Sequence, residues 1–567
     1  MIETILGRAA AAGTSLKVLA RAGIIRPYSP ITLARIAKSL AEWGTGPAGG
    51  FIALAVRAPD QVGLIDEIGS LTFQEMHERS NALAHALSER GVGEGDAVAL
   101  MCRNHRGFVD ATIAVSKLGA DLLYLNTAFA GPQLVDVLER EDPVVVIHDE
   151  EFTELLGEAS VENRLVAWAD SDDHDETVES LISSYPVEDL SPPDNHTRIV
   201  ILTSGTTGTP KGAPRNEAGI EAAVSMLSRL PLRYGWRTHI AAPLFHTWGF
   251  AHLALGMLLG STIVLRRKFD PEGCLQTVED EKCDSLVVIP VMLQRIMRLD
   301  QEILDKHELS TIKCVAASGS ALSGDLATTW MDTFGDTLYN IYGSTEVAYA
   351  SVADPVDLRE APDSAGSPPY GTVVKILDDD GKPVPDGETG RIFVGNSLLF
   401  EGYTGGGHKE VVDGLMSSGD VGRIGDDGRL YIEGRDDEMI VSGGENVFPK
   451  EVEDCLARHD SVSEVAAIGV DDEEFGKRLK AFVVVGDGAK GDEDELKDWV
   501  KQNLARYKVP REIVFLDELP RNSTGKILKR ELVEEDSAGD DSADEDSADK
   551  ESADKESADK DSADTDA

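Results

Sequence analysis

The sequence predicts an α/β protein with a large, multi-layered N-terminal domain of parallel-rich sheets and helices and a small α+β C-terminal domain. Strand-like and helix-like segments alternate from residue 97, and this alternation favours parallel sheets covered by helices. The 567 residues allow several domain equivalents, and the 41% of hydrophobic residues can fill a sizeable core.

The alternation is clearest in the first third of the chain. Short apolar runs at Ala97–Met101, Leu122–Leu125 and Val144–His148 are typical of buried strands. Between them, Gly107–Lys117 and Pro132–Glu141 predict helices with their apolar residues on one face. These segments form the first predicted layer of the large domain.

A further strand-like run, Ile199–Leu202, leads into a glycine- and threonine-rich stretch, Thr203–Gly212. Its glycines let the backbone approach a ligand closely, and its hydroxyls, N–H groups and lysine can surround a polyphosphate. A flexible surface turn uses the same residue types, but a lysine after so many small hydroxyls favours a phosphate loop. The spacing is not that of nucleoside triphosphatases, so their fold does not follow. The candidate residues are Thr203, Ser204, Gly205, Thr206, Thr207, Gly208 and Lys211.

Two further stretches contain candidate residues, and the second follows the strand-like segment Lys313–Val315. Ala242–Phe250 surrounds His246 with aromatic residues, although a lone histidine in such company is usually a core or capping residue. No second ligand stands at a metal-binding distance from it in the sequence. The small residues of Ala316–Ser323 would let a flat ring lie against the backbone, and a tight turn explains them equally well.

An aromatic residue, a glycine, two hydroxyls and a carboxylate follow the apolar run Leu338–Ile341. Tyr342 can stack on a purine, Thr345 can reach a phosphate, and Glu346 can hold Mg²⁺, which prefers one or two carboxylates together with phosphate oxygens. In a chain with 102 acidic residues, Glu346 gains its significance only from these neighbours.

The C-terminal part contains two acidic motifs and a small domain. Asp420 lies in Ser417–Gly422, and Tyr431–Ile440 reads as a short strand that runs into a charged turn, which suggests a domain junction. Beyond it we expect three strands and one helix: Val465–Val470, Lys480–Val485, Ile513–Leu516 and Asp494–Leu504. The segment Leu519–Arg530 then predicts an exposed loop that presents Lys526.

The two ends of the chain differ sharply in charge. Residues 1–43 carry a net +4, which suggests either an amphipathic membrane-surface segment or, as we favour, a helical extension packed on the main domain. Residues 534–567 repeat Ser-Ala-Asp-Lys-Glu with 16 acids and three lysines, and they are predicted to be disordered.

The whole chain has a formal net charge of −48, which excludes nucleic acid as a partner and suggests a salt-rich, halophile-like cytoplasm. Full activity without KCl would count against that origin. The five scattered cysteines favour a reducing compartment, and no apolar run is long enough for a membrane span. We therefore expect a cytoplasmic protein, with peripheral membrane contact through residues 1–43 as the alternative.

Together these motifs resemble the adenylate-forming superfamily of acyl-CoA synthetases, luciferases and peptide-synthetase adenylation domains, from about residue 50 to Leu532. Gly343–Val347 and Val441–Val447 look most like bacterial medium- or long-chain fatty acid–CoA ligases. The resemblance implies an acid–thiol ligase that uses ATP, Mg²⁺ and CoA. A carboxylate displaces pyrophosphate from ATP to give acyl-AMP, and the CoA thiol then displaces AMP.

Other activities are compatible with the same motifs. An adenylation enzyme could load an aryl or short-chain acid onto CoA or a carrier protein, although no carrier domain is visible. A luciferase-type oxidase shares the fold and would depend on oxygen. A nucleotide-binding protein without catalysis is the remaining alternative, and the presence of all the charged motif residues speaks against it.

The resemblance implies a role in ATP binding for most of the candidate residues. Thr203–Lys211 would hold the β- and γ-phosphates, Thr345 the α-phosphate and Glu346 the magnesium. The adenosine would be contacted by Ser318, Gly319, Ser320, Tyr342, Asp420 and Arg435, with Tyr342 stacked on the adenine and Asp420 on the ribose hydroxyls. Ser320-Ala321 stands where many members have Ala-Pro, so the local shape of the adenine site departs from the family pattern.

The resemblance also implies a mobile C-terminal domain. Lys526 would bridge the substrate carboxylate and the phosphate in adenylation only, and the domain would rotate about Asp437 before the second step. Gly443 and Gly444 would line the pantetheine channel, and His246 would gate or orient the acyl group. The implied division is 1–45 for the extension, 46–434 for the large domain, 435–437 for the hinge, 438–533 for the small domain and 534–567 for the tail.

Overall fold

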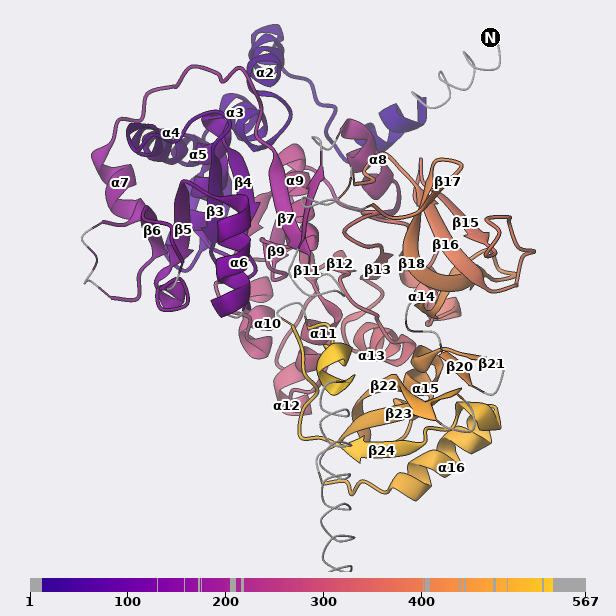
Figure 1. The fold of residues 1–567 in the computed structure, drawn as a ribbon. Helices are drawn as coiled ribbons and strands as arrows, with labels where there is room; N and C mark the ends of the chain where they lie inside the picture. The colour runs from indigo at the N-terminus through magenta and orange to yellow at the C-terminus, as the bar shows by residue number, and fades with distance from the viewer. Residues whose placement is uncertain are drawn as a thin grey trace, which may run out of the picture. The chain divides into compact units, whose positions relative to one another are not determined.

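The computed structural model describes residues 13–129, 131–157, 159–171, 174, 176–203, 211–215, 219–400, 402, 408–436, 438, 440–442, 445–472, 476–486, 488–522 and 525–533. The chain divides into two compact units (Figure 1). The first comprises Met1–Ile432 with Ser523–Gly525, and the second comprises Glu433–Asn522 with Lys526–Ala567. The predicted disordered tail and the predicted hinge residue Asp437 lie outside the described residues.

The first sheet of unit 1 contains the segments that alternate most clearly in the sequence. Its strand order is β6 (Arg164–Trp168), β5 (Val145–Asp149), β3 (Ala97–Met101), β4 (Asp121–Tyr124), β7 (Ile199–Thr203) and β8 (Lys211–Arg215). All pairs are parallel except β7 and β8, which form an antiparallel hairpin. The helices of this part are α4 (Phe73–Glu89), α5 (Arg106–Lys117), α6 (Gly131–Glu141) and α7 (Val178–Ser184). The three strands and two helices predicted between residues 97 and 148 are confirmed to within one residue.

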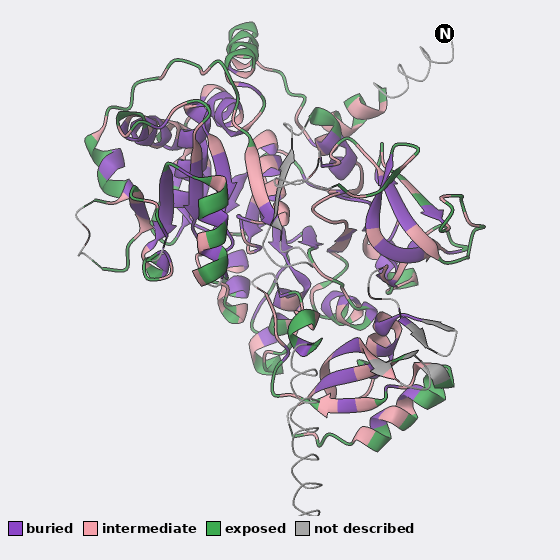
Figure 2. Cartoon of the chain, viewed as in Figure 1, coloured by how far each residue is buried: buried purple, intermediate pink, exposed green. Residues whose placement is uncertain are grey.

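The second sheet has eight strands and is also mainly parallel. Its order is β14 (Ser351–Ala353), β13 (Leu338–Tyr342), β12 (Cys314–Ala317), β11 (Ser285–Val288), β9 (Arg237–Ile240), β10 (Thr262–Val264), β1 (Val62–Asp66) and β2 (Gly69–Thr72), with antiparallel pairs only at its two ends. The accompanying helices are α3 (Pro47–Arg57), α8 (Ile220–Arg229), α9 (Thr247–Leu259), α10 (Pro271–Asp280), α11 (Pro290–Met297), α12 (Gln301–Leu304), α13 (Gly324–Phe334) and α14 (Pro355–Glu360). One buried apolar cluster takes side chains from both sheets, for example Leu100 and Val287, and joins them into one core (Figure 2).

A third sheet was not predicted from the sequence. It contains β15 (Val373–Leu377), β16 (Gly390–Gly395), β18 (Leu415–Ile424) and β17 (Val411–Val412) in antiparallel order, and β19 (Leu430–Arg435) also pairs with β18. Its longest strand, β18, mixes serines, glycines and two charged residues with apolar ones, so its hydrophobic pattern is weak.

Unit 2 is a small α+β fold. Its sheet runs β21 (Glu445–Val447), β20 (Ile440–Ser442), β23 (Gly476–Val485) and β22 (Val462–Asp472), and β24 (Glu512–Phe515) pairs with β23. Helices α15 (Pro449–Leu456) and α16 (Glu493–Asn503) share a buried core with this sheet, and a short 3₁₀ turn, η2, spans Arg506–Lys508. The predicted strands and helix of this region are confirmed.

The N-terminal segment is helical from residue 13 to residue 21 and again in α2 (Pro30–Trp43). Ala22 is 3% exposed and joins the apolar cluster that also contains Leu227 of α8. On α2, in contrast, Ile31 and Leu33 remain 68% and 50% exposed (Figure 2). Among the described residues, no helix combines the length and the hydrophobicity that a membrane crossing requires.

Candidate active site

The third sheet and the carboxyl end of β13 bring Tyr342 and Asp420 together. The Tyr342 hydroxyl donates a hydrogen bond of 2.5 Å to Oδ2 of Asp420 and lies 3.1 Å from Oγ of Ser418. Asp420 is 9% exposed on β18, and its backbone N–H donates to the Ser418 Oγ. A carboxylate accepts up to about four hydrogen bonds, so the bond from Tyr342 is compatible with binding of ribose hydroxyls.

The turn after β13 positions Thr345 and Glu346. A Cβ at Gly343 would lie 2.2 Å from the Ala348 carbonyl oxygen, so only glycine fits there without a shift of the backbone. The Ser344 hydroxyl donates to Oε2 of Glu346 over 2.9 Å and accepts from the Glu346 backbone N–H. This bond orients the carboxylate while leaving it an oxygen-rich anion, which suits the hard Mg²⁺ ion. The residues present therefore fit a magnesium ion.

The small residues after β12 support the neighbouring strand. Ser318 is 9% exposed, and its hydroxyl donates to the Ile341 carbonyl on β13 over 2.8 Å. Gly319 has φ +99°, a backbone conformation that favours glycine. Ser320 follows in the same loop, before α13. The predicted adenine-lining loop and Tyr342 therefore emerge from adjacent parallel strands, at the same edge of the sheet.

His246 precedes α9 in an aromatic environment. Its ring lies 4.6 Å from that of Phe245, and Phe250, one turn into α9, lies 5.3 Å from Tyr124. Burial lowers the pKa of His246 to about 4, so the ring is neutral at physiological pH. Its Nε2 is buried and has no hydrogen-bond partner among the described residues. A buried polar atom without a partner is costly, which makes this nitrogen a candidate for contact with a bound molecule.

The predicted phosphate loop begins and ends in strands. Thr203 pairs with Lys211 and Leu202 with Gly212 in the β7–β8 hairpin. The prediction of one loop through Gly212 is therefore wrong at its C-terminal end, because the backbone hydrogen bonds resume at Lys211. Ser204, Gly205, Thr206, Thr207 and Gly208 lie outside the described residues, as do the side chains of Thr203 and Lys211.

The remaining predicted residues belong to unit 2. Arg435 ends β19, and Gly443 and Gly444 lie outside the described residues. Lys526 is exposed, and its backbone N–H donates to Oδ1 of Asn522 over 2.9 Å. The Asn522 backbone N–H donates in return to the Lys526 carbonyl over 2.9 Å. This reciprocal pair fixes the backbone from which the lysine projects.

Sequence reasoning missed the supporting roles of Ser418 and Ser344, although both stand in motifs that it singled out. It also missed a buried group formed by Cys102, His105 and Asp149, whose potential ligand atoms lie within 4.8 Å of one another. His105 Nδ1 accepts from the Gly107 N–H, and Nε2 lies 2.7 Å from Oδ1 of Asp149. Both ring nitrogens are thus engaged, and His105 serves as the cap at the start of α5.

Comparison with known proteins agrees with this arrangement. The AMP-binding enzyme family matches residues 52–404, and the AMP-binding enzyme C-terminal domain matches residues 451–526. A feruloyl-CoA synthase of Amycolatopsis sp is 34% identical over 474 residues, which cover 82% of this chain and 93% of that protein. A 2-succinylbenzoate–CoA ligase of Geobacillus kaustophilus is 32% identical over 484 residues, covering 84% and 96%.

Among solved structures, an anthranilate CoA ligase in complex with anthranoyl-AMP superposes with a TM-score of 0.77 at 26% identity, covering 86% of this chain and 96% of that chain. The predicted fold class, a large α/β domain with parallel-rich sheets and a smaller C-terminal domain, is confirmed. The family model spans most of the large unit, and the relatives cover both units. This chain therefore belongs to the AMP-binding enzymes, the adenylate-forming superfamily that its motifs resemble.

Proposed function

We propose that the acid activated by this AMP-forming acid–thiol ligase is an aromatic carboxylic acid, which is transferred to CoA. The enzyme uses ATP and Mg²⁺ with CoA as the acceptor substrate. A medium- or long-chain fatty acid was the main expectation from the sequence. The relatives named above act on feruloyl, succinylbenzoate and anthranilate groups, which favours the alternative of an aryl acid.

The observation that carries this proposal is that aromatic side chains lie near His246. Phe245 packs against the His246 ring and Phe250 lies one turn further along α9, and aromatic pairs prefer offset or edge-to-face contacts that a planar substrate can extend. Trp248 is held in place because its indole N–H donates to the Val288 carbonyl over 2.9 Å. The neutral His246 offers Nε2 to a polar group of the acid or its thioester.

The ATP-binding roles follow the family resemblance as part of the same proposal. Asp420 would bind the ribose hydroxyls with Arg435 assisting, Tyr342 would stack on the adenine, and Ser318, Gly319 and Ser320 would line the ring. Thr345 would contact the α-phosphate, and Thr203–Lys211 the β- and γ-phosphates. When bound at Glu346, Mg²⁺ would supply charge neutralisation for the phosphate oxygens.

In the adenylation step, two negatively charged groups must approach each other. A carboxylate attacks a phosphate that is itself an anion, so a positioned cation lowers the barrier. Lys526 would supply that cation in adenylation. Gly443 and Gly444 would leave room for the pantetheine arm in the second step, because neither carries a side chain.

A substrate panel tests the aromatic assignment. Pyrophosphate release is measured with ATP and Mg²⁺ on benzoate, anthranilate, ferulate and 2-succinylbenzoate, and on acetate, octanoate and oleate, with and without CoA. We expect at least a tenfold higher kcat/KM for one of the aromatic acids than for any aliphatic acid. A clear preference for octanoate or oleate would overturn the proposal and restore the fatty acid. AMP formation that requires CoA identifies the ligase, whereas loading onto a carrier protein would not need it.

A further inference from the structure

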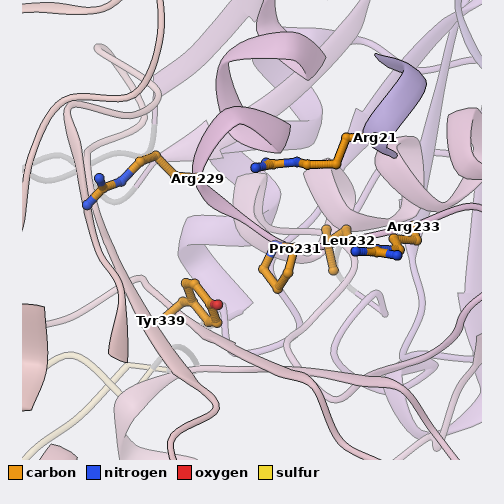
Figure 3. A pocket seen from close by; sticks show the side chains of 6 residues that line it. All are labelled: Arg21, Arg229, Pro231, Leu232, Arg233 and Tyr339. Atoms are coloured by element: carbon orange, nitrogen blue, oxygen red, sulfur yellow. The ribbon is translucent and has the colours of Figure 1, made fainter. Parts of the chain in front are cut away.

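Three arginines line a pocket on unit 1 that contains none of the candidate active-site residues. The pocket is lined by Arg21, Arg229, Pro231, Leu232, Arg233 and Tyr339, and its cavity volume is about 200 Å³ (Figure 3). It lies where the N-terminal extension meets the C-terminal end of α8 and the strand β13. We propose that this pocket is a second anion site of the protein and that it binds a small phosphate-type oxyanion.

The charge balance of the pocket departs from that of the chain. The protein has 102 acidic and 54 basic residues, so most arginines can find a carboxylate partner. Arg229 does so, since its Nη2 lies 2.6 Å from Asp357 and 3.6 Å from Asp354. Arg21 and Arg233, in contrast, form no ion pair with any described carboxylate. The pocket therefore keeps a positive charge that a bound anion would compensate.

The hydrogen-bond donors of the pocket are positioned to bind a ligand. Arg21 uses Nη2 to donate to the Leu227 and Ser228 carbonyls at the end of α8, over 2.6 and 3.3 Å, and this anchors its guanidinium. Figure 3 shows the Arg21 guanidinium and the Tyr339 hydroxyl turned toward the middle of the pocket. Burial raises the pKa of Tyr339 to about 12, so its hydroxyl stays protonated and can donate. Arg229 turns away toward its acids, but its buried Nε has no hydrogen-bond partner among the described residues.

The side chains that line the pocket favour a phosphate-type anion as the ligand. All polar side chains of the pocket are donors, and guanidinium forks match phosphate oxygens in a bidentate manner. One water molecule occupies about 30 Å³ in the liquid, so a cavity of about 200 Å³ has room for several waters. One or two phosphoryl groups can take the place of these waters. Inorganic phosphate and pyrophosphate share this chemistry, and both are tested below.

The pocket and the nucleotide site can be occupied together. Tyr339 and Tyr342 lie three residues apart on β13, so their side chains point to opposite faces of the sheet. Tyr342 contacts Asp420 on one face, while Tyr339 faces the pocket on the other. An anion beside Tyr339 would thus bridge the N-terminal extension to the large unit without competing for the nucleotide contacts of Tyr342.

The test measures anion binding while the nucleotide site is filled. The full-length protein is saturated with α,β-methylene-ATP and Mg²⁺ at a fixed KCl concentration and titrated calorimetrically with inorganic phosphate in one arm and pyrophosphate in the other. We expect one site in at least one arm, and the tighter arm identifies the preferred anion. Absence of binding in both arms would overturn the proposal.

Two variants and a control locate the site. Arg233 is exposed, and its side chain forms no hydrogen bond or ion pair with a described residue, so Arg233→Gln should fold normally and weaken binding by about tenfold, as expected for a charge-assisted bond. Arg21→Gln should weaken it by a similar factor and should therefore also reduce the rise in melting temperature that the anion causes at a fixed concentration. Arg35→Gln removes an equally exposed charge of the same extension, on α2, outside the pocket. Unchanged binding in Arg233→Gln and Arg21→Gln, or an equal loss in Arg35→Gln, would overturn the assignment.

Discussion

The hydroxyl of Tyr342 and Oδ2 of Asp420 lie 2.5 Å apart, although 78 positions separate the two residues in the chain. The bond joins the end of β13 in the large parallel sheet to β18 in the antiparallel sheet. It orients both the ring proposed to stack on adenine and the carboxylate proposed to hold the ribose. One hydrogen bond thus positions two side chains that are both proposed to contact the same nucleotide.

Removal of that hydroxyl should therefore weaken ATP binding while leaving the fold intact. We expect Tyr342→Phe to lower kcat/KM for ATP by about tenfold, because a hydrogen bond to a charged group contributes about 1.5–3 kcal/mol. Steady-state kinetics at saturating acid and CoA measure this. Tyr339→Phe makes the same change on the opposite face of the strand and should leave kcat/KM for ATP unchanged. Equal losses in the two variants would contradict the role of Tyr342.

Lys526→Ala should separate the two half-reactions. Adenylation, followed as pyrophosphate release, should fall by about 10²–10³, the usual effect of removing one charge-stabilising group. Thioester formation from supplied acyl-AMP and CoA should be retained. The matched control is Lys501→Ala on α16, an exposed lysine of the same unit. Loss of both half-reactions to the same degree would remove Lys526 from the chemistry of adenylation.

Buried histidines predict how stability depends on pH. Burial lowers the pKa of His252 to about 4, as it does for His239 and His246, whereas an unfolded histidine titrates near 6.5. Between about pH 4 and 6.5 the unfolded chain therefore binds more protons, so stability is fully present above about pH 6.5 and is lost as the pH falls toward 4. His252→Leu should reduce this loss in a melting-temperature series. His196→Gln changes an exposed histidine and should leave the slope as it is in the wild type.

A buried ion pair ties α5 to the second sheet. Arg106 donates through Nε and Nη2 to the Asp66 carboxylate, which is fully buried, with a shortest distance of 2.6 Å. Asp66→Ala would leave the arginine charge without its partner, so we expect a loss of about 3–5 kcal/mol in the free energy of unfolding, measured by denaturant titration. Glu42→Ala breaks the exposed pair with Lys38 and should cost at most about 1 kcal/mol. Comparable losses would show that burial of the Arg106 pair has no special weight.

The parts of this fold that the sequence predicted are those whose hydrophobic pattern extends over whole elements. Ala97–Met101 and Gly107–Lys117 are examples, because a buried strand and a one-sided helix each leave a clear period in the chain. The strand β18 was missed because serines, glycines and charged residues interrupt its apolar residues. The individual motif residues could be identified in the sequence, but their roles came from the resemblance to the adenylate-forming superfamily.

Contacts between residues that are far apart in the sequence could not be predicted from its hydrophobic pattern. The bond between Tyr342 and Asp420 depends on the packing of two sheets that are built from different segments of the chain. The pocket that joins Arg21 to Tyr339 spans more than half of the sequence, and no sequence motif links the arginines that line it. Only the folded chain shows that these side chains share one environment.

The hairpin of β7 and β8 has a consequence for engineering this enzyme. Five successive residue pairs, from Ile199–Arg215 to Thr203–Lys211, hold the two strands in register. The seven residues between Thr203 and Lys211 connect neighbouring strand ends. The sheet therefore fixes where the two ends of this segment must meet, so variants of the segment that keep its length can be compared with the same two strand ends in place.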